Sequence, residues 1–151
     1  MNSRKTKTAN TDAPVATQVL ATRLASALRA MAAGLVNLHS ESTSTERTFS
    51  RFVLPLAPSI AITPESLAVA LKIGPRYHID LISAAGQLDA SEWDADQQVG
   101  YRLLTQMMSA KLGDLFIAFV RGDGVIRVRT CIFGRLDDRF LVGLRAITIE
   151  T

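Results

Sequence analysis

Residues 115–149, LFIAFVRGDGVIRVRTCIFGRLDDRFLVGLRAITI, decide the fold of this chain. They contain three apolar segments in quick succession, residues 115–121, 125–133 and 140–149. The first two segments are joined by Gly122-Asp123-Gly124, which has the length and composition of a short hairpin loop. A second short turn leads into the last segment. Because the connections are short, we predict that the three segments form a meander of antiparallel strands.

The residues before this meander are predicted to form helices and shorter strands. Apolar residues recur at three- and four-residue steps over residues 15–33, which indicates an amphipathic helix. A second long helix is predicted near residues 96–112, and Thr63-Pro64-Glu65 has the residue types of a helix start. Residues 49–56 and 77–82 are strand candidates. Since helices precede and interrupt the strands, we expect an α+β fold with a mainly antiparallel sheet covered by helices.

The composition is that of one globular domain. The chain has 151 residues, of which 48% are hydrophobic and 21% are charged. These values exclude collagen-like, disulfide-rich and wholly disordered proteins. Cys131 is the only cysteine, so neither an intrachain disulfide nor a zinc site of several cysteines can form. No apolar run approaches the roughly 20 residues of a membrane-spanning helix, and we expect no membrane association.

Much of the net charge of +3 lies at the N-terminus. Within residues 1–14, three basic residues stand against one acidic residue, and no large apolar residue follows Met1. We therefore expect residues 1–14 to form a disordered basic tail and residues 15–151 to form the folded domain. A basic tail can contact nucleic acid, but a solvated terminus is the interpretation we favour.

Few groups in the sequence are suited to catalysis. Cys131 falls inside a strand pattern, which favours a packing residue over a nucleophile. His39 stands beside Ser40-Glu41-Ser42, but a catalytic triad is defined by spatial geometry, and adjacency in sequence does not support one. His78 and Asp80 are predicted to share one face of a strand, with a core or surface role for the histidine. We expect no enzymatic activity and no cofactor.

Two groups of charged residues have roles that the sequence leaves open. Six arginines fall in the last three strands: Arg121, Arg127, Arg129, Arg135, Arg139 and Arg145. A basic sheet face is a candidate nucleic-acid surface, but aromatic residues for stacking are sparse there, so we favour ion pairs with helix acids. Acidic residues also surround Trp93: Asp89, Glu92, Asp94 and Asp96. They form either a contact patch or a helix start, where acidic side chains interact favourably with the helix dipole.

Four motifs, in this order and spacing, connect the chain with a known family. Gly34-Leu35-Val36 is followed by Ser40-Glu41-Ser42, as at a helix end and the loop after it. Glu92-Trp93-Asp94 precedes the second long helix. Ile132-Phe133-Gly134 lies in a strand, and the sequence finishes with Glu150-Thr151. Over nearly the whole chain after the tail, this pattern resembles the nuclease A inhibitor family, small proteins that block a sugar-non-specific bacterial endonuclease.

The resemblance implies an α/β/α sandwich that inhibits a nuclease and catalyses no reaction. In the family, a C-terminal carboxylate approaches the catalytic Mg²⁺ of the nuclease, aided by a loop glutamate and a tryptophan. The matching residues here are Thr151, Glu41 and Trp93. Mg²⁺ takes oxygen ligands and keeps exchangeable waters, so a fixed carboxylate can replace or hydrogen-bond those waters. Glu150 is expected in an acidic rim that attracts a basic nuclease cleft. The resemblance implies that Thr151 contacts a metal only in the complex with the nuclease, which holds the Mg²⁺.

The leading hypothesis is therefore a cytoplasmic bacterial inhibitor of a non-specific, metal-dependent endonuclease. Its predicted partner-binding residues are Glu41, Trp93, Glu150 and Thr151. One alternative is a nucleic-acid-binding module that uses the basic tail and the sheet arginines, although we regard nucleic-acid binding as the less favoured reading. The other is a protein-interaction domain on the same scaffold with an unrelated partner.

Overall fold

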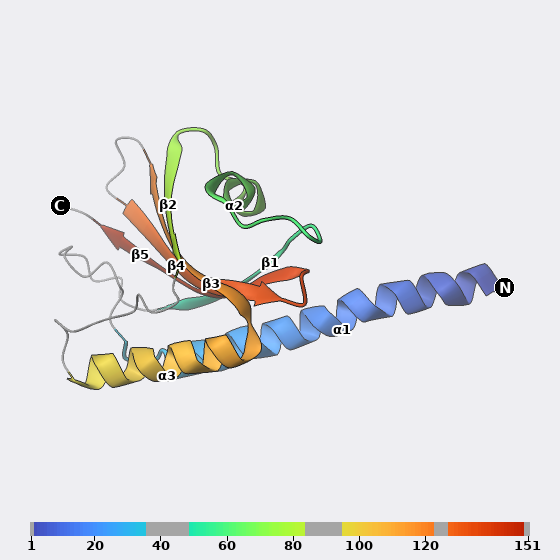
Figure 1. Cartoon of the computed structure of the whole chain (residues 1–151), viewed down its shortest axis with the longest axis horizontal. Coiled ribbons are helices and arrows are strands. Elements are labelled where there is room, and N and C mark those ends of the chain that lie inside the picture. Colours follow the sequence, from blue (N-terminus) through green and yellow to red (C-terminus); the bar gives the residue numbers. More distant parts are fainter. Residues whose placement is uncertain (1, 36–48, 84–94, 123–126, 150–151) are drawn as a thin grey trace.

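The computed structural model of the chain describes residues 2–35, 49–83, 95–122 and 127–149. In these residues three helices pack on a five-stranded antiparallel sheet (Figure 1). The helices are α1 (Asn2–Met31), α2 (Pro64–Leu71) and α3 (Ala95–Lys111). The strands are β1 (Ser50–Pro55), β2 (Tyr77–Ser83), β3 (Gly113–Gly122), β4 (Arg127–Leu136) and β5 (Phe140–Ile149).

The three C-terminal strands form the predicted meander. β3, β4 and β5 pair antiparallel in chain order, with Ile117 opposite Ile132 and Ile132 opposite Leu144. β1 pairs with the other side of β5, and β2 pairs with the other side of β3, which gives the order β1-β5-β4-β3-β2. The meander thus supplies the three central strands, and the two shorter strands form the edges. The predicted α+β architecture is confirmed.

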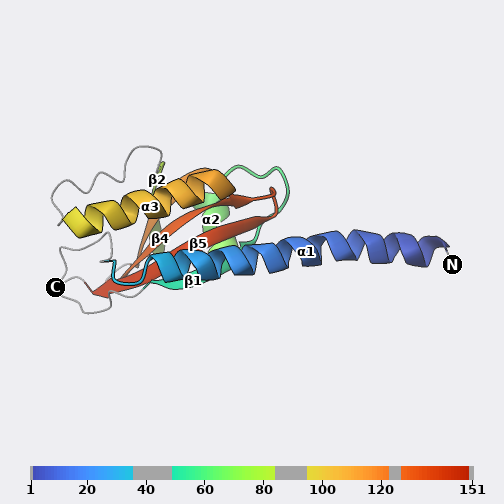
Figure 2. The same cartoon turned by 90° about the horizontal axis from the view of Figure 1, so that it is seen from below.

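α1 and α3 lie side by side on one face of the sheet (Figure 2). α1 packs on β1 and β5, and α3 packs on β3 and β4. Together with the sheet they bury one core, whose fully buried members include Ala21, Ala25, Leu28, Tyr101, Leu104, Met108, Ile132, Val142 and Leu144. Because the alanines of α1 have short side chains, the helix axis can lie close to the strands.

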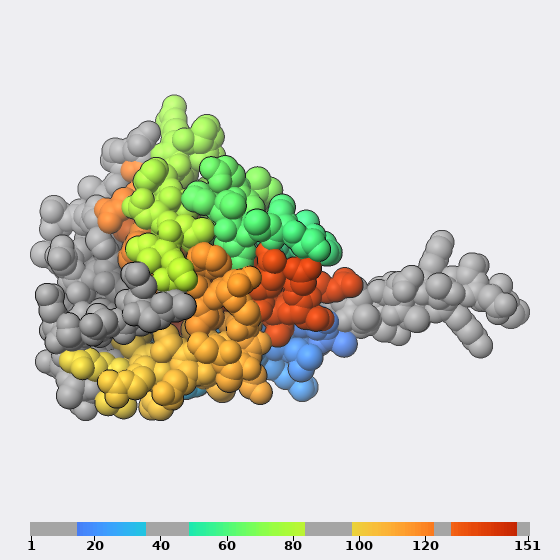
Figure 3. All heavy atoms as spheres, viewed as in Figure 1, coloured from blue at the N-terminus to red at the C-terminus, as the bar shows by residue number. Residues whose placement is uncertain are grey.

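α2 packs on the opposite face. It contacts both edge strands, β1 and β2, so the sheet curves around it, as Figure 1 shows. In the space-filling view α2 and β2 lie next to each other in green and yellow-green (Figure 3). Leu67 is buried here, and Phe133 packs against Phe52 and Phe116 with ring centroids 6.0 Å apart in both pairs. We call this face, with α2 on it, the concave face. Helices on both faces give the expected α/β/α layers.

α2 begins where the sequence predicts. Thr63 Oγ1 accepts a hydrogen bond from the N–H of Ser66 at 3.1 Å, and Ser66 Oγ accepts one from the N–H of Thr63 at 2.9 Å. This reciprocal pair, with Pro64 at the first helical position, satisfies main-chain donors that have no partner inside the helix. The helix ends at Leu71, because Lys72 adopts a left-handed conformation with φ 56°.

α1 starts at Asn2 and so includes residues 2–14, for which the sequence predicted a disordered tail. Pro14 lies inside the helix, where it has no N–H to donate to the carbonyl of Asn10. Side chains of α1 are described from Val15 onward. The division of the chain into a tail and a folded domain therefore stays a prediction.

Candidate functional site

The residues predicted to bind a partner lie outside the described residues. They are Glu41, Trp93, Glu150 and Thr151, which belong to residues 36–48, 84–94 and 150–151. The residues that flank these three segments are described, and they show where each segment joins the folded body.

The segment of residues 36–48 begins and ends against α3. Leu35 precedes it, and the Leu35 side chain lies so close to Gly100 of α3 that a Cβ on this glycine would overlap it. Phe49 follows the segment, and its ring meets the ring of Tyr101 edge-on, with centroids 6.4 Å apart and planes at 81°. Both contacts fall within the first two turns of α3.

The segment of residues 84–94 ends at this same place, because α3 begins at Ala95. Trp93 stands two residues before that helix start in the sequence. The segment with Glu41 and the segment with Trp93 therefore join the body at neighbouring points, although they are far apart along the chain.

β5 also ends here. Its last residue, Ile149, lies opposite Arg127 of β4. β1 begins at Ser50, opposite Arg145, so β5 continues past the start of β1 on the side where the chain enters from Phe49. Figures 1 and 2 show from two directions that α1 ends, α3 begins and β5 ends at one end of the molecule. We call it the attachment end.

The attachment end is built on the hydrophobic core. Leu35, Phe49 and Tyr101 are exposed by only 7%, 3% and 0%. Burial raises the pKa of Tyr101 well above its ordinary value, so its phenol stays neutral at physiological pH. Since tightly packed side chains hold these flanking residues, the segments leave the body from fixed points.

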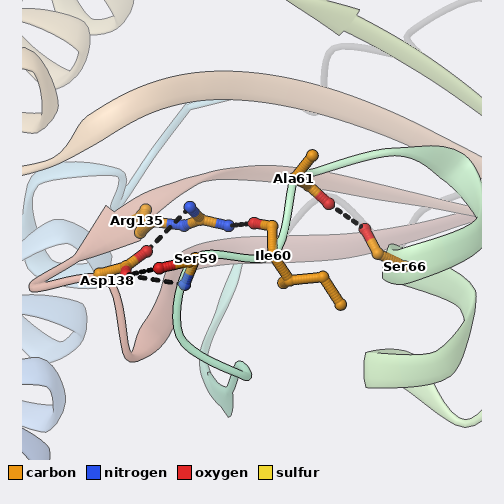
Figure 4. Close-up of polar contacts among 6 residues, drawn as sticks. All are labelled: Ser59, Ile60, Ala61, Ser66, Arg135 and Asp138. Atoms are coloured by element: carbon orange, nitrogen blue, oxygen red, sulfur yellow. Dashed lines mark hydrogen bonds and ion pairs between the residues drawn. The ribbon is translucent and has the colours of Figure 1, made fainter.

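At the opposite end of the sheet, Arg135 forms hydrogen bonds to two connections, the turn between β4 and β5 and the segment between β1 and α2 (Figure 4). Its Nη1 donates a hydrogen bond to Asp138 Oδ1 at 3.0 Å, and its Nη2 donates one to the carbonyl oxygen of Ile60. Asp138 Oδ2 accepts a hydrogen bond from the N–H of Ser59 at 2.8 Å. The turn between β4 and β5 is thereby fixed to the segment between β1 and α2. The acidic partner of Arg135 lies in a turn, not in a helix as the sequence led us to expect.

Arg129 and Arg145 lie on the concave face beside Cys131. Arg145 is directly opposite this cysteine, and Arg129 is two positions along β4. No described residue forms an ion pair with either arginine. Burial raises the pKa of Cys131 to about 11, although the two arginine charges act to lower it. The thiol, exposed by 1%, is therefore protonated at neutral pH, and the prediction of a packing residue is confirmed.

His78 and Asp80 form a pair on the surface of β2. His78 Nε2 and Asp80 Oδ1 are 3.0 Å apart, and the two side chains are 73% and 52% exposed. They alternate with Ile79, which faces the concave side, so they lie on the sheet face that carries α1 and α3. The shared face predicted from the sequence is confirmed, and the histidine is a surface residue.

Within the described ranges, histidine, cysteine, aspartate and glutamate side chains do not gather in groups of three or more that could hold a metal ion. None of the helices in the described part of the chain is long and apolar enough to cross a membrane. The fold defines the class of protein as an α+β domain with helices on both faces of a five-stranded antiparallel sheet. No protein-family model matches the sequence, and no curated protein is significantly similar to it.

Sequence reasoning missed the hydrogen-bond network around Asp138, although the sequence contains a signal for the turn in which Asp138 lies. Asp137 and Asp138 both have positive φ, 52° and 55°. Two consecutive left-handed residues are typical of the tight turns that connect antiparallel strands, and aspartate tolerates this conformation better than most residues. A pair of aspartates between two strand patterns therefore marks such a turn. The partners across the fold, Ser59 and Ile60, have no comparable signal.

Proposed function

We propose that this protein inhibits a non-specific, metal-dependent bacterial endonuclease and that the segments joined at the attachment end bind the nuclease. The convergence of their attachment points supports this proposal. Leu35 and Phe49 flank the segment with Glu41, Ile149 precedes Glu150-Thr151, and α3 begins two residues after Trp93, all at one end of the molecule. Attachment at one end allows these residues to share a single binding surface.

In the proposed mechanism, β5 positions the residues that follow it. β5 lies between β1 and β4 in the sheet, and main-chain pairing with β4 continues to Ile149. A strand held in this way restrains the start of Glu150-Thr151. The carboxylate of Thr151 then approaches the Mg²⁺ of the nuclease and takes the place of waters that a substrate phosphate would displace.

The remaining proposed contacts orient and strengthen the complex. Glu41 and Glu150 add negative charge that attracts a basic cleft and accelerates association. Trp93 supplies a large apolar anchor, the kind of residue that contributes most to interface affinity. In this proposal the protein carries out no reaction and holds no cofactor, and the metal belongs to the nuclease. In this proposal the inhibitor acts in the cytoplasm.

The decisive experiment is an inhibition titration of a sugar-non-specific, Mg²⁺-dependent endonuclease. Adding Gly-Ser-Gly after Thr151 displaces the carboxylate and leaves β5 unchanged, so inhibition should weaken strongly while the melting temperature stays the same. The same three residues added before Met1 serve as the control and should have little effect, as should Thr151→Ser. Full inhibition by the C-terminally extended chain would rule out the carboxylate mechanism.

The other contacts are tested by truncation. Glu41→Ala and Trp93→Ala should each raise the inhibition constant by roughly 30-fold, a typical cost for a central interface residue. Glu65→Ala removes an exposed carboxylate from α2, away from the attachment end, and should leave inhibition unchanged. If all three variants behave alike, the attachment end is not the nuclease-binding surface.

One observation favours a second function, nucleic-acid binding. Arg129 and Arg145 form no ion pair with any described residue, so their charges are available on the concave face. Binding through arginines to phosphates weakens steeply as salt rises. We expect residues 15–151 to show no measurable duplex binding at physiological salt. Micromolar binding that is lost in Arg129→Ala and Arg145→Ala would favour this alternative. If neither activity appears, the protein-interaction domain remains the better hypothesis.

A further inference from the structure

β2 is an edge strand without the usual protection against pairing. It pairs with β3 over seven consecutive residues with no bulge, and in the described part of the chain no strand pairs with its outer side. Natural edge strands are commonly blocked by proline, lysine, a bulge or a covering helix. The other edge, β1, ends at Pro55 and packs under α1. β2 contains neither proline nor lysine.

The surface of β2 leaves side chains for an added strand to cover. Tyr77 and Ile82 are 45% and 37% exposed. In the space-filling view the residues of β2, in yellow-green, lie at the molecular surface (Figure 3). Charged residues on an edge normally repel a second strand, but the carboxylate of Asp80 lies next to the imidazole of His78, a group that can pair with a carboxylate. They attract a strand with the complementary pattern.

The complementary pattern is that of β2 itself. When two copies pair antiparallel about a two-fold axis at Ile79, His78 of each copy lies directly opposite Asp80 of the other. Directly opposite side chains on neighbouring strands have Cβ atoms about 4.5–5.5 Å apart, close enough to interact. On the concave side the same register sets Tyr77 opposite Leu81. Two-fold symmetry produces both contacts twice.

Neighbouring registers lack this match. An axis at Asp80 sets the two Asp80 carboxylates opposite each other, and an axis at His78 sets the two imidazoles opposite each other. Like groups in opposite positions are unfavourable. The order of charges therefore selects the register centred on Ile79.

We propose that a second copy of this chain pairs with β2 and forms a symmetric dimer with one continuous sheet. The dimer contact lies along the sheet edge farthest from β1. The proposal rests on the pairing and exposure of β2 and does not depend on the inhibitor function.

The test is analytical ultracentrifugation of the full chain over a range of concentrations. The unmodified chain should show a reversible monomer–dimer equilibrium. Asp80→Lys places lysine opposite His78, and His78→Asp places aspartate opposite Asp80. Each should weaken self-association by about 10-fold, because the change occurs at two symmetric contacts. Glu65→Lys, a charge reversal on α2, serves as the control and should leave the equilibrium unchanged.

Mixing the two variants in equal amounts gives the sharpest result. In a mixed dimer the introduced lysine faces the introduced aspartate, and the retained His78 faces the retained Asp80. The mixture should therefore form a one-to-one dimer with nearly the affinity of the unmodified chain. Circular dichroism of each variant checks that it is folded. A monomeric wild type at millimolar concentration, a dimer insensitive to both variants, or a mixture that stays monomeric would each overturn the proposal.

Discussion

Gly143 of β5 lies directly opposite Phe133 of β4, and a Cβ on this glycine would come within 2.7 Å of the Cα of Phe133. On its other side Gly143 is paired with Phe52 of β1. The rings of the two phenylalanines approach to 6.0 Å between centroids. The absence of a side chain at residue 143 allows the main chains and both rings to pack this closely in the curved sheet.

Gly143→Ala should therefore destabilise the protein by about 1–3 kcal/mol. The atoms that the new methyl group meets include main-chain atoms of β4, which cannot rotate away. Urea denaturation measures the change. Gly74→Ala is the matched control, because no atom lies within 4 Å of a Cβ there, and it should be neutral or slightly stabilising. Equal effects for both substitutions would contradict the close packing at Gly143.

Asp138→Asn should lower the free energy of unfolding by about 1 kcal/mol, because it removes the charge that pairs with Arg135. Asparagine tolerates the positive φ of this position, so the substitution tests the carboxylate and not the turn. Asp137→Asn makes the same chemical change at the neighbouring residue, where the exposed carboxylate accepts a 3.4 Å hydrogen bond from Thr17 Oγ1. Thermal denaturation should show a clear loss for the first variant and almost none for the second.

Thr130→Val should stabilise the protein by about 1 kcal/mol. Thr130 is fully buried, and its Oγ1 has no hydrogen-bond partner. Valine has nearly the same shape and removes the cost of burying an unsatisfied hydroxyl. Thr105→Val provides the opposite case, because Thr105 Oγ1 donates to the carbonyl of Tyr101 at 2.8 Å. Chemical denaturation of both variants should give shifts of opposite sign, and a destabilised Thr130→Val variant would indicate a partner for this hydroxyl.

Stability should fall at alkaline pH through Cys131. Burial raises its pKa from 9.0 to about 11, so within this window the unfolded chain releases the thiol proton while the folded chain keeps it. The stability contributed by the protonated thiol of Cys131 is fully present below its pKa in the unfolded chain. This stability is lost as pH rises through its pKa in the folded protein. The stability difference between the unmodified protein and Cys131→Ala should shrink by on the order of 2 kcal/mol across the window. Denaturation curves on both sides of the window test this, and a constant difference would contradict it.

Deletion of residues 1–13 should leave the melting temperature almost unchanged. These residues have no large apolar side chain other than Met1 to bury, and a helix that begins at Pro14 starts with a favourable residue. Differential scanning calorimetry of the two chains measures the effect. A loss of more than about 1 kcal/mol would show that the segment packs on the domain.

The sequence by itself determined the local elements of this fold. Three apolar segments joined by short turns predicted the meander of β3, β4 and β5, and Thr63-Pro64-Glu65 predicted the start of α2. These signals are local, because hydrophobic periodicity, helix capping and turn chemistry act among residues a few positions apart. The resemblance around Glu41 and Trp93 also rests on short stretches of sequence and stays a prediction.

Only the tertiary structure decided how these elements meet. The pairing of β1 with β5, the position of β2 at the other edge and the curvature of the sheet around α2 depend on contacts between residues distant in sequence. The convergence of the attachment points depends on Leu35 against Gly100 and on Phe49 against Tyr101. Burial of apolar surface drives such contacts, and this driving force has no preferred direction. A hydrophobic pattern in the sequence therefore does not predict which residues will pack against each other.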